Sequence, residues 1–333
     1  MKINLANSKF DDILGQEEVK EQLKSAFISG RHVIIVGPPG IGKTTLAKNV
    51  ARLLPEITVN DCGFNCTADN LVCPKCTSGE KSESKKSHGG ERFIRVQGSP
   101  DLTSEDLLGD IDPILALKFG PLSPKAFTPG KIFRANKGIL FFDELNRCPE
   151  KLQNALLQVL EEGAVTIGSY AIDFKVDFIF IGTMNPEDKT TEELSDVFVD
   201  RFDFMYMDYP ETLEIETEIV KKKGEKIIEF PDDLLKKTIK FVRILRISPQ
   251  LEKKPSVRAS LGLYERAQAN AFINGRKKVE FDDVSRAIRS VLIHRIRLKP
   301  SVKYLMDKKS FVVEQFAQFC QNEHLETKKS DLG

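Results

Sequence analysis

The sequence predicts an α/β domain, built on a parallel sheet that holds nucleotide phosphates, followed by a smaller helical domain. Three observations carry this prediction. A glycine loop joins an apolar strand to a helix near the N-terminus, a later apolar strand ends in two adjacent acids, and the C-terminal third has helical apolar spacing. A strand, glycine loop and helix in series is typical of phosphate-binding α/β folds.

The glycine loop is the strongest of these signals. Residues 37–44 read Gly-Pro-Pro-Gly-Ile-Gly-Lys-Thr, between the apolar run 32–36 and the helical spacing of 45–54. Glycines let the backbone wrap an anion, and the helix N-terminus adds N–H donors. We expect Lys43 to reach the β- and γ-phosphates of ATP and Thr44 to hold Mg²⁺. The predicted ATP-binding loop comprises Gly37, Pro38, Pro39, Gly40, Ile41, Gly42, Lys43, Thr44 and Thr45.

Length, charge and hydropathy set the broad class. The 333 residues have room for two domains, and 50 basic against 49 acidic residues give no bias toward nucleic acid or membrane. Nothing approaches the ~18 consecutive apolar residues of a transmembrane helix. The N-terminus lacks the apolar core of a signal peptide, so we expect a cytoplasmic protein.

Polar side chains follow two further apolar strands. Residues 139–142 lead into Asp143 and Glu144, and residues 178–184 lead into Asn185. Because ligands lie at the carboxyl edge of a parallel sheet, we expect Asp143 to hold Mg²⁺ and Glu144 to polarise the attacking water. Asn185 by itself is typical of a turn. Together with the other two strand ends, it is interpreted as an amide that orients water.

Two arginines complete the predicted catalytic set. Arg201 closes the α/β domain, and an arginine there is ordinarily a surface residue. Ring-forming ATPases, however, offer such an arginine to the neighbour's γ-phosphate. Arg258 begins a helix of the second domain and could close over the nucleotide.

The domain boundary is predicted after residue 210, giving a core over 1–210 and a helical domain over 211–333. Helices are expected over 211–223, 232–247, 258–274 and 284–297. The tail 328–333 is expected to be disordered. Within the core, residues 101–130 form an insert, and residues 163–177 predict a β-hairpin that turns near Gly168-Ser169.

A third insert, residues 60–90, is rich in cysteine. Cys62, Cys66, Cys73 and Cys76 are spaced C-x₃-C-x₆-C-x₂-C, and four thiolates suit a tetrahedral Zn²⁺. An iron–sulfur cluster, a disulfide pair and free thiols remain open alternatives, and His88 could substitute as a ligand. Residues 77–90 are interpreted as a flexible linker, and Cys148 and Cys320 as ordinary thiols.

Together these motifs resemble the AAA+ ATPases, in the clade of magnesium-chelatase ATPase subunits and MoxR proteins. The resemblance covers residues 8–295. Residues 10–18 are similar to the clade's opening motif, which implies that Ile13 and Leu14 line the adenine pocket. Residues 127–136 resemble the approach to the Walker B strand, 144–149 a MoxR-like segment, 182–186 sensor 1, and 255–263 the sensor 2 region.

The resemblance implies an AAA+ core with β-hairpin inserts, an α-helical lid, and ATP hydrolysis with Mg²⁺. It implies a homo-oligomeric ring, with a hexamer expected, that remodels or activates a protein partner carrying a von Willebrand A (adhesion) domain. A nucleic-acid motor like the related helicases is the alternative. The near-neutral charge and the absence of a basic stripe with aromatic residues count against it.

Overall fold

The computed structural model describes residues 10, 12–80, 82–121, 123–166, 173–186 and 194–325. These divide into two compact units. One comprises residues 10–37 and 42–207, and the other comprises residues 38–41 and 208–325. The two units are described separately below.

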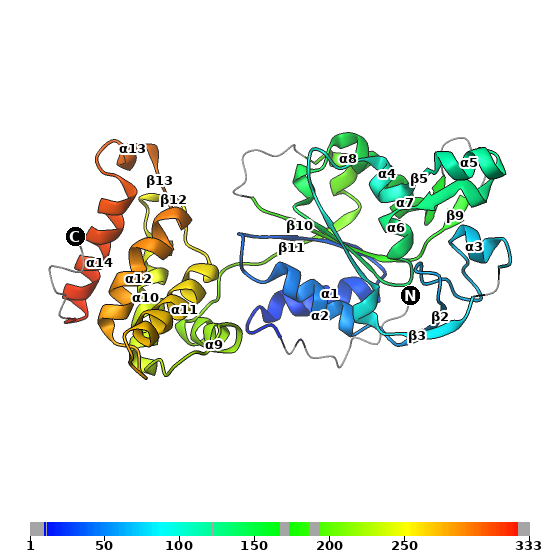
Figure 1. Cartoon of the computed structure of the whole chain (residues 1–333). Helices are drawn as coiled ribbons and strands as arrows, with labels where there is room; N and C mark the ends of the chain where they lie inside the picture. Colours follow the sequence, from blue (N-terminus) through cyan, green and yellow to red (C-terminus); the bar gives the residue numbers. More distant parts are fainter. Residues whose placement is uncertain are drawn as a thin grey trace. The chain divides into compact units, whose positions relative to one another are not determined.

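The first unit is built on a five-stranded parallel sheet (Figure 1). The strand order is β11 (Phe202–Tyr206), β1 (His32–Val36), β10 (Ile179–Met184), β7 (Ile139–Asp143) and β4 (Phe93–Gln97). Every neighbouring pair in this order is parallel. The carboxyl ends of β1, β10 and β7 therefore lie at one edge of the sheet, as the α/β prediction requires.

Helices cover both faces of this sheet (Figure 1). Helices α1 (Glu17–Ile28) and α2 (Lys43–Arg52) lie on one face, and α6 (Lys131–Arg134) and α7 (Glu150–Glu162) lie on the other, with the short α8 (Asp196–Val199). Because both faces are covered, the central strands are apolar in successive positions rather than alternating with polar residues. The apolar residues of β1 and β7 are accordingly all buried.

The two expected inserts beside the sheet have structure of their own. The 101–130 insert contains α4 (Ser104–Leu108), β5 (Gly109–Ile111), α5 (Pro113–Phe119), the 3₁₀ helix η2 (Pro124–Ala126) and β6 (Phe127–Pro129). Strands β5 and β6 pair antiparallel. The expected hairpin is confirmed, because β8 (Ala164–Thr166) and β9 (Asp173–Lys175) pair antiparallel. Its expected turn at Gly168-Ser169 lies outside the described residues.

The interpretation of residues 77–90 as a flexible linker is wrong. Strand β3 (Ser84–Ser87) pairs antiparallel with β2 (Ile57–Asn60), and the 3₁₀ helix η1 (Gly89–Arg92) then leads into β4. A Cβ on Gly89 would lie 2.0 Å from the carbonyl oxygen of Ala51, so this glycine packs directly on α2. Strand pairing depends on backbone hydrogen bonds to β2, which a composition of Ser, Lys and Gly does not reveal.

The second unit is helical, as expected. Its main helices are α9 (Leu213–Lys223), α10 (Asp232–Ile247), α11 (Val257–Ile273) and α12 (Phe281–Leu292). The expected extension of the fourth helix to residue 297 is wrong. The 3₁₀ helix η4 (Ile293–Arg295) follows α12, and β13 (Arg297–Leu298) pairs with β12 (Leu251–Lys253). Backbone pairing with β12 ends the helix, which periodicity alone could not show.

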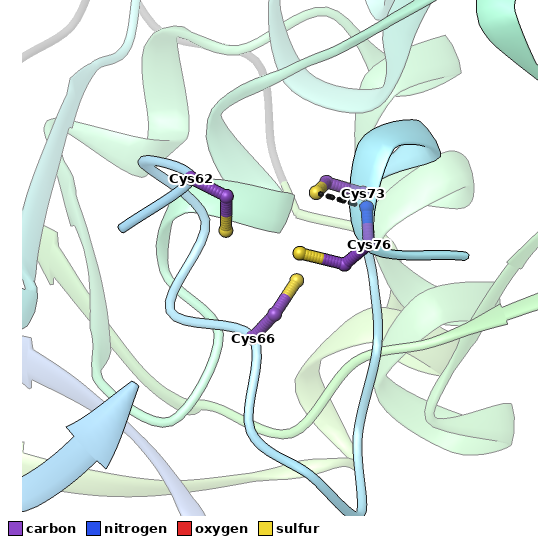
Figure 2. A group of neighbouring side chains, drawn as sticks. All are labelled: Cys62, Cys66, Cys73 and Cys76. Carbon is purple, nitrogen blue, oxygen red and sulfur yellow. Dashed lines mark hydrogen bonds between the residues drawn. The ribbon is translucent and has the colours of Figure 1, made fainter. Parts of the chain in front are cut away.

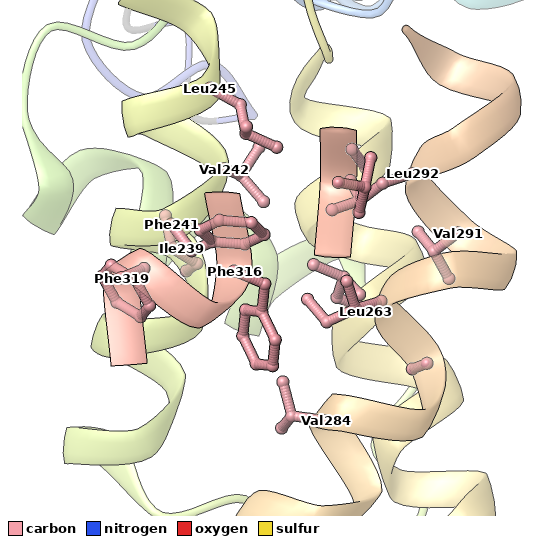
Figure 3. Close-up of a cluster of buried hydrophobic side chains, with 14 of the residues drawn as sticks. Ile239, Phe241, Val242, Leu245, Leu263, Val284, Val291, Leu292, Phe316 and Phe319 are labelled. Carbon is pink, nitrogen blue, oxygen red and sulfur yellow. The ribbon is translucent and has the colours of Figure 1, made fainter. Parts of the chain in front are cut away.

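Two further helices complete this unit, α13 (Pro300–Lys303) and α14 (Lys308–Asn322). The phenyl rings of Phe316 and Phe319 on α14 lie 5.1 Å and 5.3 Å from that of Phe241 on α10 (Figure 3). Helix α14 thus closes the apolar core of the unit and was not among the predicted helices. The expected disordered tail, residues 328–333, lies outside the described residues.

A buried ion pair joins α9, α10 and α11 within this unit. Glu216 on α9 is fully buried and accepts hydrogen bonds from Arg246 Nη2 at 2.6 Å and Ser260 Oγ at 2.6 Å. Arg246 also donates from Nε to the carbonyl of Pro255 at 2.7 Å. One carboxylate therefore joins three helices and fixes the start of α11, which carries Arg258.

Candidate nucleotide site

The glycine loop connects β1 to α2 in the conformation that a phosphate loop requires. Gly40 and Gly42 have φ angles of 77° and 105°, in the left-handed region that favours glycine. Gly42 is the N-cap of α2 and supplies no side chain to cap it. The Gly37 amide donates to the Met184 carbonyl at 3.1 Å, and Lys43 Nζ donates to the Gly37 carbonyl. The loop is thus tied to β10, with the lysine curled back over it.

The segment before α1 lies beside this loop. Ile13 is buried, and a Cβ on Gly42 would lie 3.8 Å from its Cδ1 atom. Leu14 is half-buried. Arg52 at the end of α2 forms a 2.5 Å ion pair with Asp12. This ion pair holds the segment against the helix that follows the loop.

Thr183 holds the two acids at the end of β7. Its hydroxyl donates to Asp143 Oδ1 at 2.7 Å and accepts from the Glu144 amide at 3.1 Å. Glu144 has a φ of 55°, which is uncommon for a residue other than glycine. Backbone strain of this kind clusters at functional sites. Sequence analysis did not single out Thr183, although it precedes Asn185 by two residues.

Strand β4 supplies two further partners that sequence analysis missed. Arg95 Nη2 lies 2.6 Å from Asp143 Oδ2, and Gln97 Nε2 donates to Glu144 Oε2 at 2.9 Å. Arg147 Nη1 lies 3.0 Å from the same Glu144 oxygen. Arg95 and Gln97 alternate along a strand whose other positions are apolar. That alternation was a readable signal, but only the pairing of β4 with β7 shows what the two side chains face.

Gly98 allows β4 and β7 to converge at this edge. Its amide donates to the Asp143 carbonyl at 2.7 Å. A Cβ at Gly98 would lie 2.1 Å from the carbonyl oxygen of Glu144, closer than real Cβ atoms approach backbone. Any side chain here would push the two strand ends apart and separate Gln97 from Glu144.

The remaining predicted residues lie in three different places. Asn185 follows β10 directly, at the same edge of the sheet as Asp143. Arg201 precedes β11 and so lies where the parallel strands begin, whereas the phosphate loop follows the carboxyl end of β1. The length of one strand, roughly 16 Å, separates the two positions. Arg201 forms an ion pair with Glu161 on α7 and donates from Nη1 to the Val197 carbonyl at 2.9 Å. Arg258 lies in the first turn of α11, in the second unit.

The four cysteines of the 60–90 insert come together. Their Sγ atoms all lie within 4.8 Å of one another. Cys62 and Cys66 come from the loop after β2, and Cys73 and Cys76 from α3 (Pro74–Thr77) and its N-cap (Figure 2). His88, the alternative ligand, instead lies 3.2 Å from Glu56 through its Nδ1 atom. None of the six cysteines, all of which the structure describes, is paired in a disulfide.

Comparison with known proteins agrees with this fold. The family described as "ATPase family associated with various cellular activities (AAA)" matches residues 75–204. The family "Magnesium chelatase, subunit ChlI" matches residues 9–84, and the "AAA lid domain" matches residues 244–312. Among the residues that the structure describes, no helix is long and apolar enough to cross a membrane.

Individual relatives cover nearly the whole chain. The magnesium-chelatase subunit ChlI homolog of Methanocaldococcus jannaschii is 30% identical, over 93% of this chain and 91% of its own length. A structure of the complex between subunits BchI and BchD of magnesium chelatase matches with a TM-score of 0.51 and 22% identity, covering 89% of this chain and 98% of that one. A mutant of RuvB from Thermotoga maritima matches with a TM-score of 0.55 and 19% identity, covering 96% of this chain and 85% of that one.

The parallel sheet, the phosphate loop and the paired acids define a P-loop ATPase fold with a helical lid. The chain belongs to the AAA+ ATPases, in the clade of magnesium-chelatase ATPase subunits and MoxR proteins. The two structural likenesses, both below 25% identity, support the fold alone.

Proposed function

We propose that the chain hydrolyses ATP to ADP and phosphate, and that it works as a motor that remodels or activates a protein partner. The observation that carries the proposal is the placement of Glu144. Its carboxylate is held by Gln97 and Arg147, beside Asp143 and at the carboxyl edge of the sheet. A positioned carboxylate is what water needs to attack a phosphoryl group.

The residues present fit ATP and Mg²⁺. The backbone of Gly40 and Gly42 leaves the start of α2 open to an anion, because no side chain caps that helix. Lys43 and Thr44 stand at the first two positions of α2, where the ammonium and the hydroxyl would serve the phosphates and the metal ion. Magnesium would neutralise charge on the phosphates, with Asp143 contributing to its surroundings.

The catalytic work then falls to side chains around Glu144. We propose that Glu144 accepts a proton from the attacking water, and that Gln97 and Arg147 orient its carboxylate. Thr183 fixes the Glu144 backbone, and Asn185 orients the water from the adjoining strand end. Arg95 forms an ion pair with Asp143 and so holds the carboxylate that would contribute to the magnesium site.

The position of Arg201 is an argument that the protein forms an oligomer. It stands at the opposite edge of the sheet from the phosphate loop, so it is badly placed to serve its own chain's nucleotide. An arginine that acts on a neighbouring copy needs this kind of position. We therefore propose a homo-oligomeric ring in which Arg201 serves the next subunit. Arg258 on the helical unit would close over the nucleotide.

The partner is proposed from the relatives. The Methanocaldococcus jannaschii relative, 30% identical, is named as a homolog of a magnesium-chelatase subunit, and a subunit works together with other proteins. By likeness, we propose that this chain engages a separate protein, one that carries a von Willebrand A domain. The nucleic-acid motor is not favoured, because the likeness to RuvB supports only the fold and the chain carries a formal charge of +1.

Two variants test the ATPase proposal. Lys43→Ala should abolish ATP binding, because the γ-phosphate loses its compensating charge. Glu144→Gln should bind ATP normally but hydrolyse it at least about a hundredfold more slowly, because an amide cannot take a proton from water. Fluorescent-nucleotide titration and phosphate release measure the two effects. Glu105→Gln, an exposed acid in the 101–130 insert, is the matched control. Normal turnover in the Glu144 variant would refute the assignment.

A further inference from the structure

We propose that Cys62, Cys66, Cys73 and Cys76 bind one zinc ion, which braces the insert against the ATPase core. This site lies outside the nucleotide site and does not depend on its activity. The four Sγ atoms already lie within 4.8 Å of one another. Zinc–sulfur bonds of about 2.3 Å in a tetrahedron place the sulfurs about 3.8 Å apart. Closing the site therefore needs movements of about 1 Å or less at each sulfur.

The backbone presents the four thiols inward. Figure 2 shows the side chains of Cys62 and Cys66 on one side and those of Cys73 and Cys76 on the other, all directed at a common centre. Pro74 opens α3, and Cys73 caps it by accepting the Cys76 amide at 3.5 Å. This turn brings two thiols separated by only two residues onto the same side, as paired zinc ligands require.

Hydrogen-bond donors surround the sulfurs. Cys66 Sγ accepts the Val72 amide at 3.2 Å, and Cys76 Sγ accepts Asn60 Nδ2 at 3.3 Å. Together with the Cys76 amide on Cys73, three of the four sulfurs have an N–H donor. Four thiols that bind Zn²⁺ release four protons and leave a net charge of −2. Donors of this kind spread that charge and orient the ligands.

The site also has a structural task. Cys66, Cys73 and Cys76 are buried and belong to the same apolar core cluster as Phe127 and Phe133. A short segment that contributes so few apolar side chains needs another source of order, and a bound metal ion supplies it. The disulfide alternative would join the cysteines only in pairs and leave this common centre unused.

Asparagine side chains connect the cysteine loop to the nucleotide-site strand. Asn65 Nδ2 donates to the Arg134 carbonyl at 3.0 Å, and Asn136 Nδ2 donates to the Asn65 carbonyl at 3.1 Å. Asn70 Nδ2 donates to Asn136 Oδ1 at 3.3 Å. Asn136 is fully buried and stands shortly before β7, the strand that ends in Asp143. We infer that zinc stabilises the cysteine loop and its contacts with the segment before β7, and that it takes no part in hydrolysis.

Metal analysis of the full chain, purified without added metal, is the first test. The expected result is about one zinc per chain, with six free thiols after denaturation in chelator. Less than about a tenth of a zinc per chain, with the four insert thiols titrating in the native protein, would overturn the proposal. Stoichiometric iron with visible absorbance would overturn it in favour of an iron centre.

Variants separate metal binding from packing. Cys62 is partly exposed whereas Cys320 is buried in the helical unit, so loss of packing alone predicts the greater cost for Cys320→Ala. The zinc proposal predicts the reverse. Cys62→Ala should lose the zinc and lower Tm by at least about 5 °C. Cys320→Ala should keep the zinc and lower Tm by less. Cys62→His should retain zinc, because three cysteines and one histidine form an ordinary zinc site.

ATP affinity serves as the check that the variants are folded. It should remain near that of the unaltered chain in Cys62→His and Cys320→Ala. Full zinc occupancy in Cys62→Ala, or a smaller loss of stability there than in Cys320→Ala, would overturn the proposal.

Discussion

Gln97 donates a hydrogen bond from Nε2 to Oε2 of Glu144 at 2.9 Å. The two residues are far apart in sequence and meet because β4 and β7 pair in parallel, with Gln97 opposite Asp143. Gly98 makes the approach possible, since a Cβ there would strike the Glu144 carbonyl. The orientation of the proposed catalytic carboxylate therefore depends on a neighbouring strand as well as on its own.

Gln97→Ala should lower ATP turnover about ten- to a hundredfold and leave ATP affinity nearly unchanged. The Glu144 carboxylate would lose an amide donor that orients it. Steady-state phosphate release and nucleotide titration measure the two quantities, with Gln22→Ala on the exposed face of α1 as the control.

A second substitution at this position sharpens that test. Gln97→Glu would remove the same amide donor and put in its place a carboxylate that repels Glu144. Its turnover should fall at least as far as that of Gln97→Ala. Unchanged turnover in both Gln97 variants would mean that Gln97 does not position Glu144.

Arg201→Ala should cut turnover sharply while leaving nucleotide affinity nearly intact. Arg201 stands at the far edge of its own sheet, so the proposal has it stabilise charge on the neighbour's nucleotide. Mixing Arg201→Ala protein with Glu144→Gln protein should restore part of the activity, because some interfaces then combine both intact groups. Phosphate release across a series of mixing ratios is the measurement.

The ion pair between Arg201 and Glu161 provides the matched control. If Arg201 served only that pair, Glu161→Gln would reduce turnover as much as Arg201→Ala. Action on a neighbour predicts that Glu161→Gln is nearly neutral. No rescue at any mixing ratio, in assemblies shown to exchange subunits, would exclude action between subunits.

His32 should make the first unit acid-sensitive. Its Nδ1 atom accepts the Phe180 amide at 3.1 Å, and burial, followed by the charge of Arg31, lowers the pKa of His32 to about 4. The unfolded chain has an ordinary histidine pKa near 6.5, so it binds the proton first as pH falls. Stability is therefore present above about pH 6.5 and is lost between there and about pH 4, by roughly 2 kcal/mol at pH 5.

His32→Asn keeps an acceptor for the Phe180 amide but does not titrate in this range. Between pH 7.5 and pH 5, the unaltered chain should lose about 2 kcal/mol more unfolding free energy than this variant, measured by urea denaturation. His294→Asn, at an exposed histidine, should behave like the unaltered chain. Equal pH dependence in the His32 variant and the unaltered chain would contradict the prediction.

The sequence by itself determined the class of this protein, because its signals are local. The glycine loop, the apolar run ending in Asp143 and Glu144, and the 3.6-residue periodicity of 232–247 each depend on neighbours in the chain. Strand β1 and helix α10 have the predicted bounds for the same reason. The cysteine spacing similarly identified a possible metal site without showing that the four sulfurs would meet.

Only the tertiary structure decided which distant residues lie at the candidate site. Arg95, Gln97 and Thr183 reach the two acids because β4 and β10 flank β7, and strand order is set by packing across the whole sheet rather than by local pattern. The same holds for β3, whose polar residues form a strand only because β2 offers backbone partners. Arg201 was proposed from its position at the end of the α/β domain, but its place at the amino end of β11 follows from the parallel pairing of β11 with β1.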